Sequence, residues 1–249
     1  MRWWRRKSFW WKAIPVMVLA VMIGKFGICH SLADWKTASR ASAGIAPDPA
    51  THREAIVQVY GARAFGWRGY FGVHTWVAVK PTNAAAFTVY EVIGWRVRRG
   101  APAIYISNRP ADGRWFDAMP EILADVRGEG VDKMIQRIDR AARTYRYKDE
   151  YRAWPGPNSN TFVAQIAREV PELKLDLPPT AIGKDYLSDG AVFSKTPSGT
   201  GYQFSLGGLL GLMVGREEGV ELNILGLIFG IDPLGPAIKL PMAGRIGGT

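Results

Sequence analysis

Residues 155–163, Pro-Gly-Pro-Asn-Ser-Asn-Thr-Phe-Val, constrain the fold more than any other stretch, because they predict the abrupt start of a helix. Apolar residues recur at steps of three and four from Phe162 to Val170, and Pro171 ends the pattern. The candidate N-caps are Asn158, Ser159, Asn160 and Thr161. This stretch therefore predicts a helix that follows directly on a proline-rich approach.

Ser159 is thereby expected at the N-terminus of this helix or one residue from it. The first N–H groups of a helix have no partner within it and carry a partial positive charge, which suits a developing oxyanion. Ser159 is therefore a candidate nucleophile, with the N–H groups of residues 159 and 160 as oxyanion donors. The alternative is that Ser159 or Asn160 only caps the helix, a role that contributes about 1 kcal/mol of stability.

Segments rich in β-branched and aromatic residues predict strands at 55–60, 75–79 and 86–93. Residues 121–126 are interpreted as a short helix and 131–145 as an amphipathic helix with a basic outer face. Two glycine-rich apolar runs, at 209–214 and 220–229, predict a β-hairpin. Its apolar residues are expected in the core, or alternatively in contact with a lipid or acyl chain. The proline-containing tail is expected to lack regular structure.

The order of these segments resembles the circularly permuted papain-like fold of lecithin retinol acyltransferase-like proteins and some bacterial hydrolases. The resemblance rests on G-V-H-T-W-V-A-V at 72–79, a second strand, a helical middle and Y-R-A-W-P-G-P-N-S-N-T-F-V at 151–163. The run from Trp154 through L-P-P-T-A-I-G-K-D-Y-L at 177–187 is also similar to an uncharacterised bacterial family of domains of unknown function. The resemblance implies that His74 is the base and Ser159 replaces a catalytic Cys, with Glu91 or Tyr90 as orienting group.

The residues themselves allow the same assignment. A serine nucleophile needs a histidine that takes its proton and a third group that fixes the tautomer of that histidine. Only His52 and His74 follow residue 33, and His52 lies in an apparent linker, so His74 is the candidate base. Glu91 is the candidate orienting group, because Tyr90 must point to the opposite face of its strand. The alternative is that His74 is a structural histidine beside Trp76.

The first 33 residues predict a membrane segment. They contain six basic residues and no acid, and residues 13–24 are uncharged. Twelve uncharged residues suit the core of a signal peptide, with Ser31-Leu-Ala33 as a cleavage site. Four tryptophans before this run, Trp3, Trp4, Trp10 and Trp11, and Trp35 after it favour a retained anchor with its N-terminus inside. Both alternatives predict export, and we expect a domain on the periplasmic side of a bacterial inner membrane.

Composition limits the remaining choices. A chain of 249 residues that is 47% hydrophobic can bury one core, which predicts an anchor at 1–33, a linker at 34–53 and one domain at 54–249. The net charge of +10 falls to +4 without the first 33 residues, so it does not indicate a nucleic-acid partner. Cys29 is the only cysteine, so neither a disulfide within the chain nor a thiol nucleophile in the domain is available. No metal or cofactor motif is present.

The sequence therefore predicts an exported α+β domain with an antiparallel sheet, packed helices and a permuted papain-like topology. Two functions remain open. The domain is either a pseudoenzyme that binds a peptidoglycan fragment, a lipid or an envelope protein, or a serine-dependent hydrolase or acyltransferase. In the second case its substrate is an ester or amide of the envelope, and Ser159, His74 and Glu91 are its catalytic residues.

Overall fold

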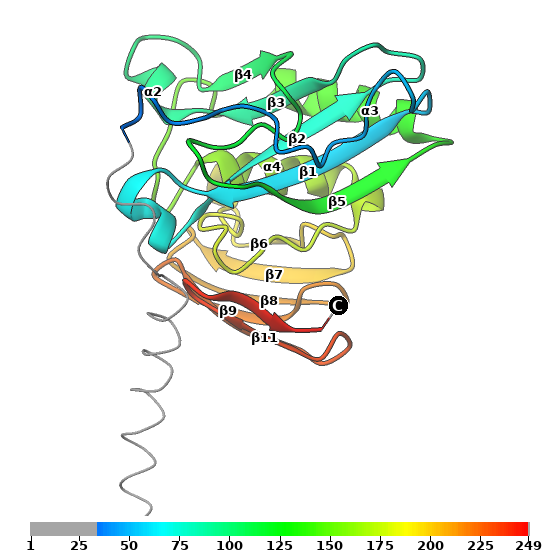
Figure 1. Cartoon of the computed structure of the whole chain (residues 1–249). Coiled ribbons are helices and arrows are strands. Elements are labelled where there is room, and N and C mark those ends of the chain that lie inside the picture. Colours follow the sequence, from blue (N-terminus) through cyan, green and yellow to red (C-terminus); the bar gives the residue numbers. More distant parts are fainter. Residues whose placement is uncertain (1–33, 249) are drawn as a thin grey trace, which may run out of the picture.

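The computed structural model describes residues 34–248 and contains two antiparallel β-sheets with a few packed helices (Figure 1). These sheets and helices confirm the predicted combination of antiparallel strands and helices. The predicted N-terminal anchor or signal lies outside the described residues, and the permuted papain-like relationship stays a prediction. Within residues 34–248, no helix combines the length and apolar character that crossing a bilayer requires.

The first sheet has five strands in the order β4-β3-β2-β1-β5. Its three central strands were expected from their β-branched and aromatic residues, and each is longer or shorter than predicted by a few residues. Because side chains alternate along a strand, successive residues serve the two faces of the sheet. The strands are β1 (Ile56–Arg63), β2 (Val73–Lys80), β3 (Thr88–Val92), β4 (Ile104–Ser107) and β5 (Glu121–Arg127).

Both faces of this sheet are buried, one by helices and the other by a loop. The face with Val57, Val77 and Val79 packs against helices α3 (Val131–Arg143) and α4 (Ser159–Glu169). The opposite face carries Tyr60 and Trp76 and is covered by aromatic residues of the loop that follows β4. The site described below depends on this division of the sheet into a helix-covered face and a loop-covered face.

Both long helices follow the sequence patterns that predicted them. Helix α3 buries Ile135 and Ile138 on one side and leaves its basic side in water. Helix α4 ends at Glu169, just before Pro171, as the pattern requires. The remaining helical turns are α2 (Gly94–Val97), η1 (Gly66–Tyr70), η2 (Pro171–Leu173) and η3 (Ser188–Gly190).

The short helix predicted at 121–126 is wrong, because these residues form the edge strand β5. The sequence Glu-Ile-Leu-Ala-Asp-Val-Arg contains good helix formers, but β5 pairs along almost its whole length with β1. Strand preference depends on the neighbours a segment meets, so pairing with an already buried strand overrides a modest helix propensity.

The second sheet has seven strands, and each pairs with its neighbours in the sequence. The predicted hairpin is present as β8 and β9, but the second apolar run breaks at Leu225 and Gly226 and continues as β10. The tail also forms two strands, so the expectation of an irregular tail is wrong. The strands are β6 (Phe193–Lys195), β7 (Gly201–Leu206), β8 (Leu210–Gly215), β9 (Gly219–Ile224), β10 (Leu227–Asp232), β11 (Ala237–Leu240) and β12 (Gly244–Gly247).

The inner face of this sheet, which meets the rest of the protein, is polar. Glu221 on β9 lies between two buried lysines, with Nζ of Lys184 at 2.6 Å and Nζ of Lys239 at 2.8 Å from its carboxylate oxygens. Lys239 also contacts a carboxylate oxygen of Asp176 at 2.7 Å. This network of paired charges joins the sheet to residues 176–184. The apolar residues of the hairpin were expected in the core, but buried ion pairs occupy the inner face instead.

Residues 34–53, the predicted linker, contact the loop that covers the five-stranded sheet. Ser42 donates to a carboxylate oxygen of Asp112 at 2.8 Å, and the N–H groups of Ile45 and Ala46 donate to the other oxygen. The N–H of Ser39 also donates to Asp117. The chain ahead of β1 is thus attached to the same side of the protein as the loop (Figure 1).

Candidate functional site

Helix α4 begins with a capping box built on Asn158. The side-chain oxygen of Asn158 accepts from the N–H groups of Asn160 at 2.9 Å and Thr161 at 3.1 Å, and Thr161 Oγ1 accepts from the N–H of Asn158. The Asn158 amide also donates to the carbonyls of Ala153 and Ile182. The cap is therefore Asn158, and neither Ser159 nor Asn160 has the capping role considered as an alternative.

Ser159 is the first residue of α4, as the sequence predicted. Within the described residues, no group accepts a hydrogen bond from its N–H, so this donor is available to a ligand. The N–H of Asn160 is occupied by the cap, so the expected oxyanion hole of two donors is reduced to one. The amide of Asn160 is also occupied, because it donates to the carbonyls of Val73 and Ile182.

His74 and Glu91 meet on the loop-covered face of the five-stranded sheet. Nε2 of His74 lies 3.0 Å from Oε2 of Glu91, and Oε1 of Glu91 accepts from Nε of Arg109 at 2.9 Å. The imidazole stacks on Trp115, with ring centres 3.6 Å apart, and the Arg109 guanidinium lies over Trp76. The predicted partner of His74 is thus in place, within an aromatic cage that the sequence did not indicate.

The protonation of this pair follows from its surroundings. Burial lowers the pKa of His74 below its usual value, and the hydrogen bond with Glu91 offsets only part of this effect. Burial alone would raise the pKa of Glu91, but His74 and Arg109 lower it by more. At neutral pH Glu91 is therefore a carboxylate and His74 a neutral imidazole whose Nε2–H donates to it. Nδ1 of His74 makes no hydrogen bond to the described residues.

Ser159 and His74 lie on opposite faces of the sheet. His74 shares its face with Trp76, whereas Thr75 points to the helix-covered face, where its hydroxyl donates to Oδ1 of Asn160 at 3.0 Å. No hydrogen bond among residues 34–248 joins His74 to Ser159. Tyr90 shares the helix-covered face and donates to Asp139 of α3, so the prediction that only one of residues 90 and 91 can face His74 is confirmed. The catalytic role of Ser159, His74 and Glu91 stays a prediction.

Ser159 lies instead at the junction of two adjoining cavities. The first, of about 330 Å³, runs from Ser159 along η1 toward the turn between β9 and β10. The second, of about 390 Å³, runs past the end of β2 to His74 and Trp115. The two share six lining residues, so they form one two-lobed cavity. The shared residues are Ala64, Arg68, Val73, Tyr151, Ala153 and Ser159.

The lining of the two-lobed cavity is apolar and aromatic, with two cationic groups. Arg68 lines both lobes and Arg98 lines the second, whereas neither lobe is lined by an acidic residue. Burial raises the pKa of the Tyr151 phenol, although the charges of both arginines and a hydrogen bond with Ser159 act to lower it. Tyr151 packs tightly over Gly94, where an added methyl group would lie 2.4 Å from the ring. The cavity therefore suits a ligand with an apolar body and an anionic group.

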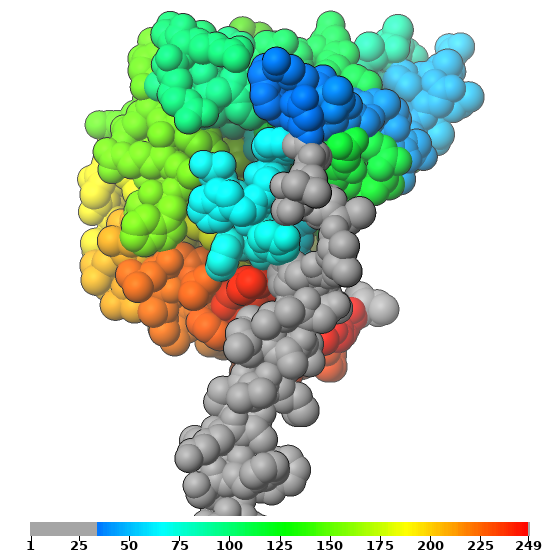
Figure 2. All heavy atoms as spheres, turned by 60° about the vertical axis from the view of Figure 1, so that its left-hand side comes forward, coloured from blue at the N-terminus to red at the C-terminus, as the bar shows by residue number. Residues whose placement is uncertain are grey.

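Figure 2 shows the side of the protein on which η1, the segment around Tyr151 and the turn between β9 and β10 come together. Trp67 and Trp154 are 63% and 51% exposed there, so large aromatic surfaces border the first lobe. Nε1 of Trp154 donates to the carbonyl of Leu225, which ties the border of the lobe to the seven-stranded sheet. Within the described residues, no group of three or more His, Cys, Asp or Glu side chains could hold a metal ion.

Sequence reasoning found part of this site. It placed Ser159 at the start of a helix, included Asn158 among the candidate caps and paired His74 with Glu91. It missed Arg109 and Tyr151, which lie in irregular segments with no periodic pattern. The Gly- and aromatic-rich residues 61–72 were a usable signal, because they contribute Trp67 and Arg68 to the cavity.

The fold and site define an antiparallel α+β protein with a two-lobed apolar cavity at the start of a helix. The model of a family described as "Protein of unknown function (DUF3750)" matches residues 54–186, and the chain belongs to this family. The matched residues include His74, Glu91 and Ser159 and end before the seven-stranded sheet. No curated protein and no solved structure matches the chain.

Proposed function

We propose that this protein binds an anionic amphiphile of the bacterial envelope in the two-lobed cavity, as an exported domain held at the membrane by its N-terminal segment. The observation that carries this proposal is the lining, which combines apolar walls with Arg68 and Arg98 and contains no carboxylate. Ligand pockets are mostly apolar with a few placed polar groups, and this lining selects for a negative head group on an apolar body.

The geometry supports binding over serine catalysis. A general base must come within hydrogen-bond reach of the proton that it takes, directly or through one water. His74 and Ser159 both line the second lobe but belong to opposite faces of the sheet, and among residues 34–248 no hydrogen bond joins them, while Nε2 of His74 donates to Glu91. The unpaired N–H of Ser159 and the guanidinium of Arg68 can instead donate hydrogen bonds to the oxygen atoms of a bound head group. A papain-like ancestry is compatible with this proposal, as the cleft of a pseudoenzyme.

The experiment is photo-crosslinking of the full chain with a fatty acid that carries a diazirine and an alkyne. We expect labelled peptides from the cavity, above all those that contain Tyr151 and Trp154. Arg68→Ala should reduce the labelling several-fold, because it removes the cation shared by both lobes. Arg140→Ala is the matched control, since Arg140 is an exposed arginine on α3, away from the cavity. Equal labelling of all three proteins, or labelling confined to other peptides, would refute the proposal.

A further inference from the structure

The outer face of the seven-stranded sheet is almost entirely apolar and exposed. Alternate residues of β7 to β11 point away from the rest of the protein, and neighbouring strands align them in continuous rows across the sheet. We call this set the outer face. Its exposed members, from 38% to 73% accessible, are Tyr202, Leu206, Leu210, Leu212, Val214, Val220, Leu222, Ile224, Leu227, Phe229, Ile231 and Ile238.

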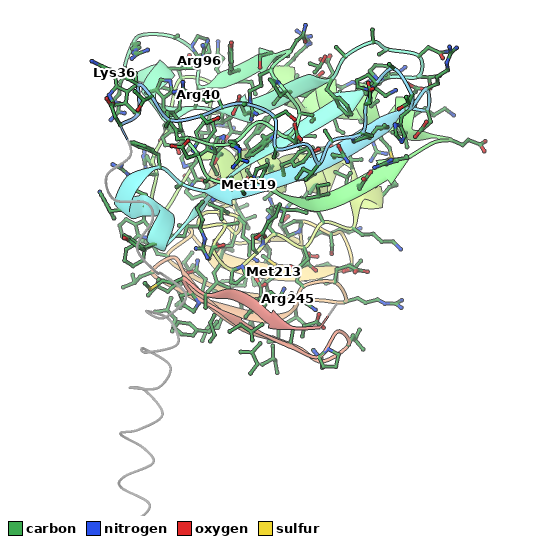
Figure 3. All side chains as sticks on the ribbon, in the orientation of Figure 1. Lys36, Arg40, Arg96, Met119, Met213 and Arg245 are labelled. Atoms are coloured by element: carbon green, nitrogen blue, oxygen red, sulfur yellow. The ribbon has the colours of Figure 1, made fainter. Side chains whose placement is uncertain are left out.

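The charges of the same strands all point inward. Glu221, Asp232 and Lys239 are buried and paired, and Figure 3 shows this sheet below the rest of the protein, with side chains projecting from its lower side. An antiparallel sheet with one wet face normally turns its polar residues to water and its apolar residues to the core. Here the polarity is reversed, so the outer face is built for an apolar surrounding.

The size of the outer face also argues against contact with water alone. Its twelve side chains together expose an apolar area on the order of 1,000 Å², whereas the largest such patch on a soluble monomer is usually a few hundred Å². None of the twelve residues is charged, and the charged residue that borders the outer face is Lys195 on the edge strand β6, opposite Tyr202, so a partner gains little from charge complementarity there. A surface of this kind needs an equally uncharged partner, which a bilayer interior or a second apolar sheet provides.

We propose that the outer face lies on a lipid bilayer. Three further observations favour lipid over a second copy of the chain. The first is the uncharged run at 13–24 in the 33 residues that precede Asp34, which predicts a segment in the membrane. The others are the exposed aromatics at one edge of the face, Trp67 and Trp154, and the continuity of the face with the cavity. Tryptophan is enriched at membrane–water interfaces, and Leu227 belongs to both the outer face and the cavity wall.

This inference goes beyond the proposed ligand and does not depend on it, because the outer face can rest on lipid whatever the cavity holds. It places the opening of the first lobe beside the membrane, where Trp154 is tied to the turn at Leu225. An amphiphile could then pass between bilayer and cavity without crossing water.

The test measures the surroundings of the outer face in the full-length protein. Cys29, the only cysteine, is replaced by serine, and an environment-sensitive fluorophore is attached at Leu222→Cys in the middle of the outer face. Arg140→Cys on α3 is the matched control, and Leu212→Cys is a second position on the outer face if Leu222→Cys lowers the melting temperature. Each protein is placed in vesicles of phosphatidylethanolamine and phosphatidylglycerol that contain spin-labelled lipid.

We expect the fluorophore at residue 222 to be blue-shifted and several-fold more quenched by the spin-labelled lipid than the fluorophore at residue 140. Equal quenching at both positions with water-like emission would overturn the proposal. A blue shift without quenching would also overturn it, because another protein surface would then cover the outer face. In that case, cross-linking of Leu222→Cys between two copies by a bifunctional maleimide would identify a dimer instead.

Discussion

Replacing Asn158 with alanine should destabilise the protein by about 2 kcal/mol, whereas Ser159→Ala should cost about 1 kcal/mol, because it removes only the hydrogen bond between the Ser159 hydroxyl and Tyr151. Asn158 is the N-cap of α4 and is buried, and loss of such a cap alone costs about 1 kcal/mol. Its amide also donates to the carbonyls of Ala153 and Ile182. The Ile182 carbonyl still accepts from the Asn160 amide, so the main further loss is the hydrogen bond to the Ala153 carbonyl, about 1 kcal/mol.

Asn158→Ser separates these two contributions, because a serine hydroxyl caps a helix but cannot replace the amide donor. We expect this variant to lie about midway between wild type and Asn158→Ala. Urea unfolding followed by circular dichroism measures all three variants, and an unchanged slope with denaturant shows that the folded state has kept its compactness. If Ser159→Ala cost as much as Asn158→Ala, the assignment of Asn158 as the cap would be refuted.

Wild type should not react with a fluorophosphonate at Ser159 any faster than His74→Gln does, because His74 faces the other side of the sheet. A reaction that is lost in both His74→Gln and Ser159→Ala, but kept in the control Ser188→Ala, would restore the serine-enzyme hypothesis. The free energy of unfolding should fall as pH drops below about 6.5, since the pKa of His74 is lowered in the folded state and the unfolded chain takes up the proton first. Protonation of Glu91, whose folded pKa is also lowered, should add a further loss at lower pH. Thermal melts should show that the melting temperature of His74→Gln depends less steeply on pH just below about 6.5 than that of wild type. Glu221→Ala should lower the free energy of unfolding by about 3–5 kcal/mol, because it leaves two buried lysines without their shared carboxylate. Substitution of its exposed neighbour, Leu222→Ala, should change that free energy by less than about 0.5 kcal/mol. Similar losses in the two variants would argue against the buried network.

The difference between prediction and structure at the second sheet has a clear physical cause. Strict alternation, as in Val220-Glu-Leu-Asn-Ile224, shows that a segment is a strand with one apolar and one polar face. It does not show which face meets the protein, because that depends on what the sheet packs against. The apolar residues were expected in the core, but Lys184 and Asp176 pair with the polar face and turn the apolar face outward.

The candidate site divides in the same way. The helix start at Ser159 and the shared face of His74 and Glu91 follow from local periodicity, which is encoded within a few residues. The position of the helix start relative to the strand face that carries His74 and Glu91 is not encoded locally. Whether His74 or Thr75 faces α4 depends on the side of the sheet on which the helix packs, and the structure places Thr75 there.

The sequence alone therefore determined the three central strands of the first sheet, the hairpin strands of the second, both long helices, the position of Ser159 and the absence of a domain cysteine, because each depends on neighbours along the chain. Only the tertiary structure decided that residues 121–126 form a strand, that His74 and Ser159 occupy opposite faces, and that a two-lobed cavity lined by Arg68 lies at the start of α4. It also decided the outward direction of the apolar sheet face. These features depend on contacts between residues far apart in the chain, and the energies of such contacts override local propensity.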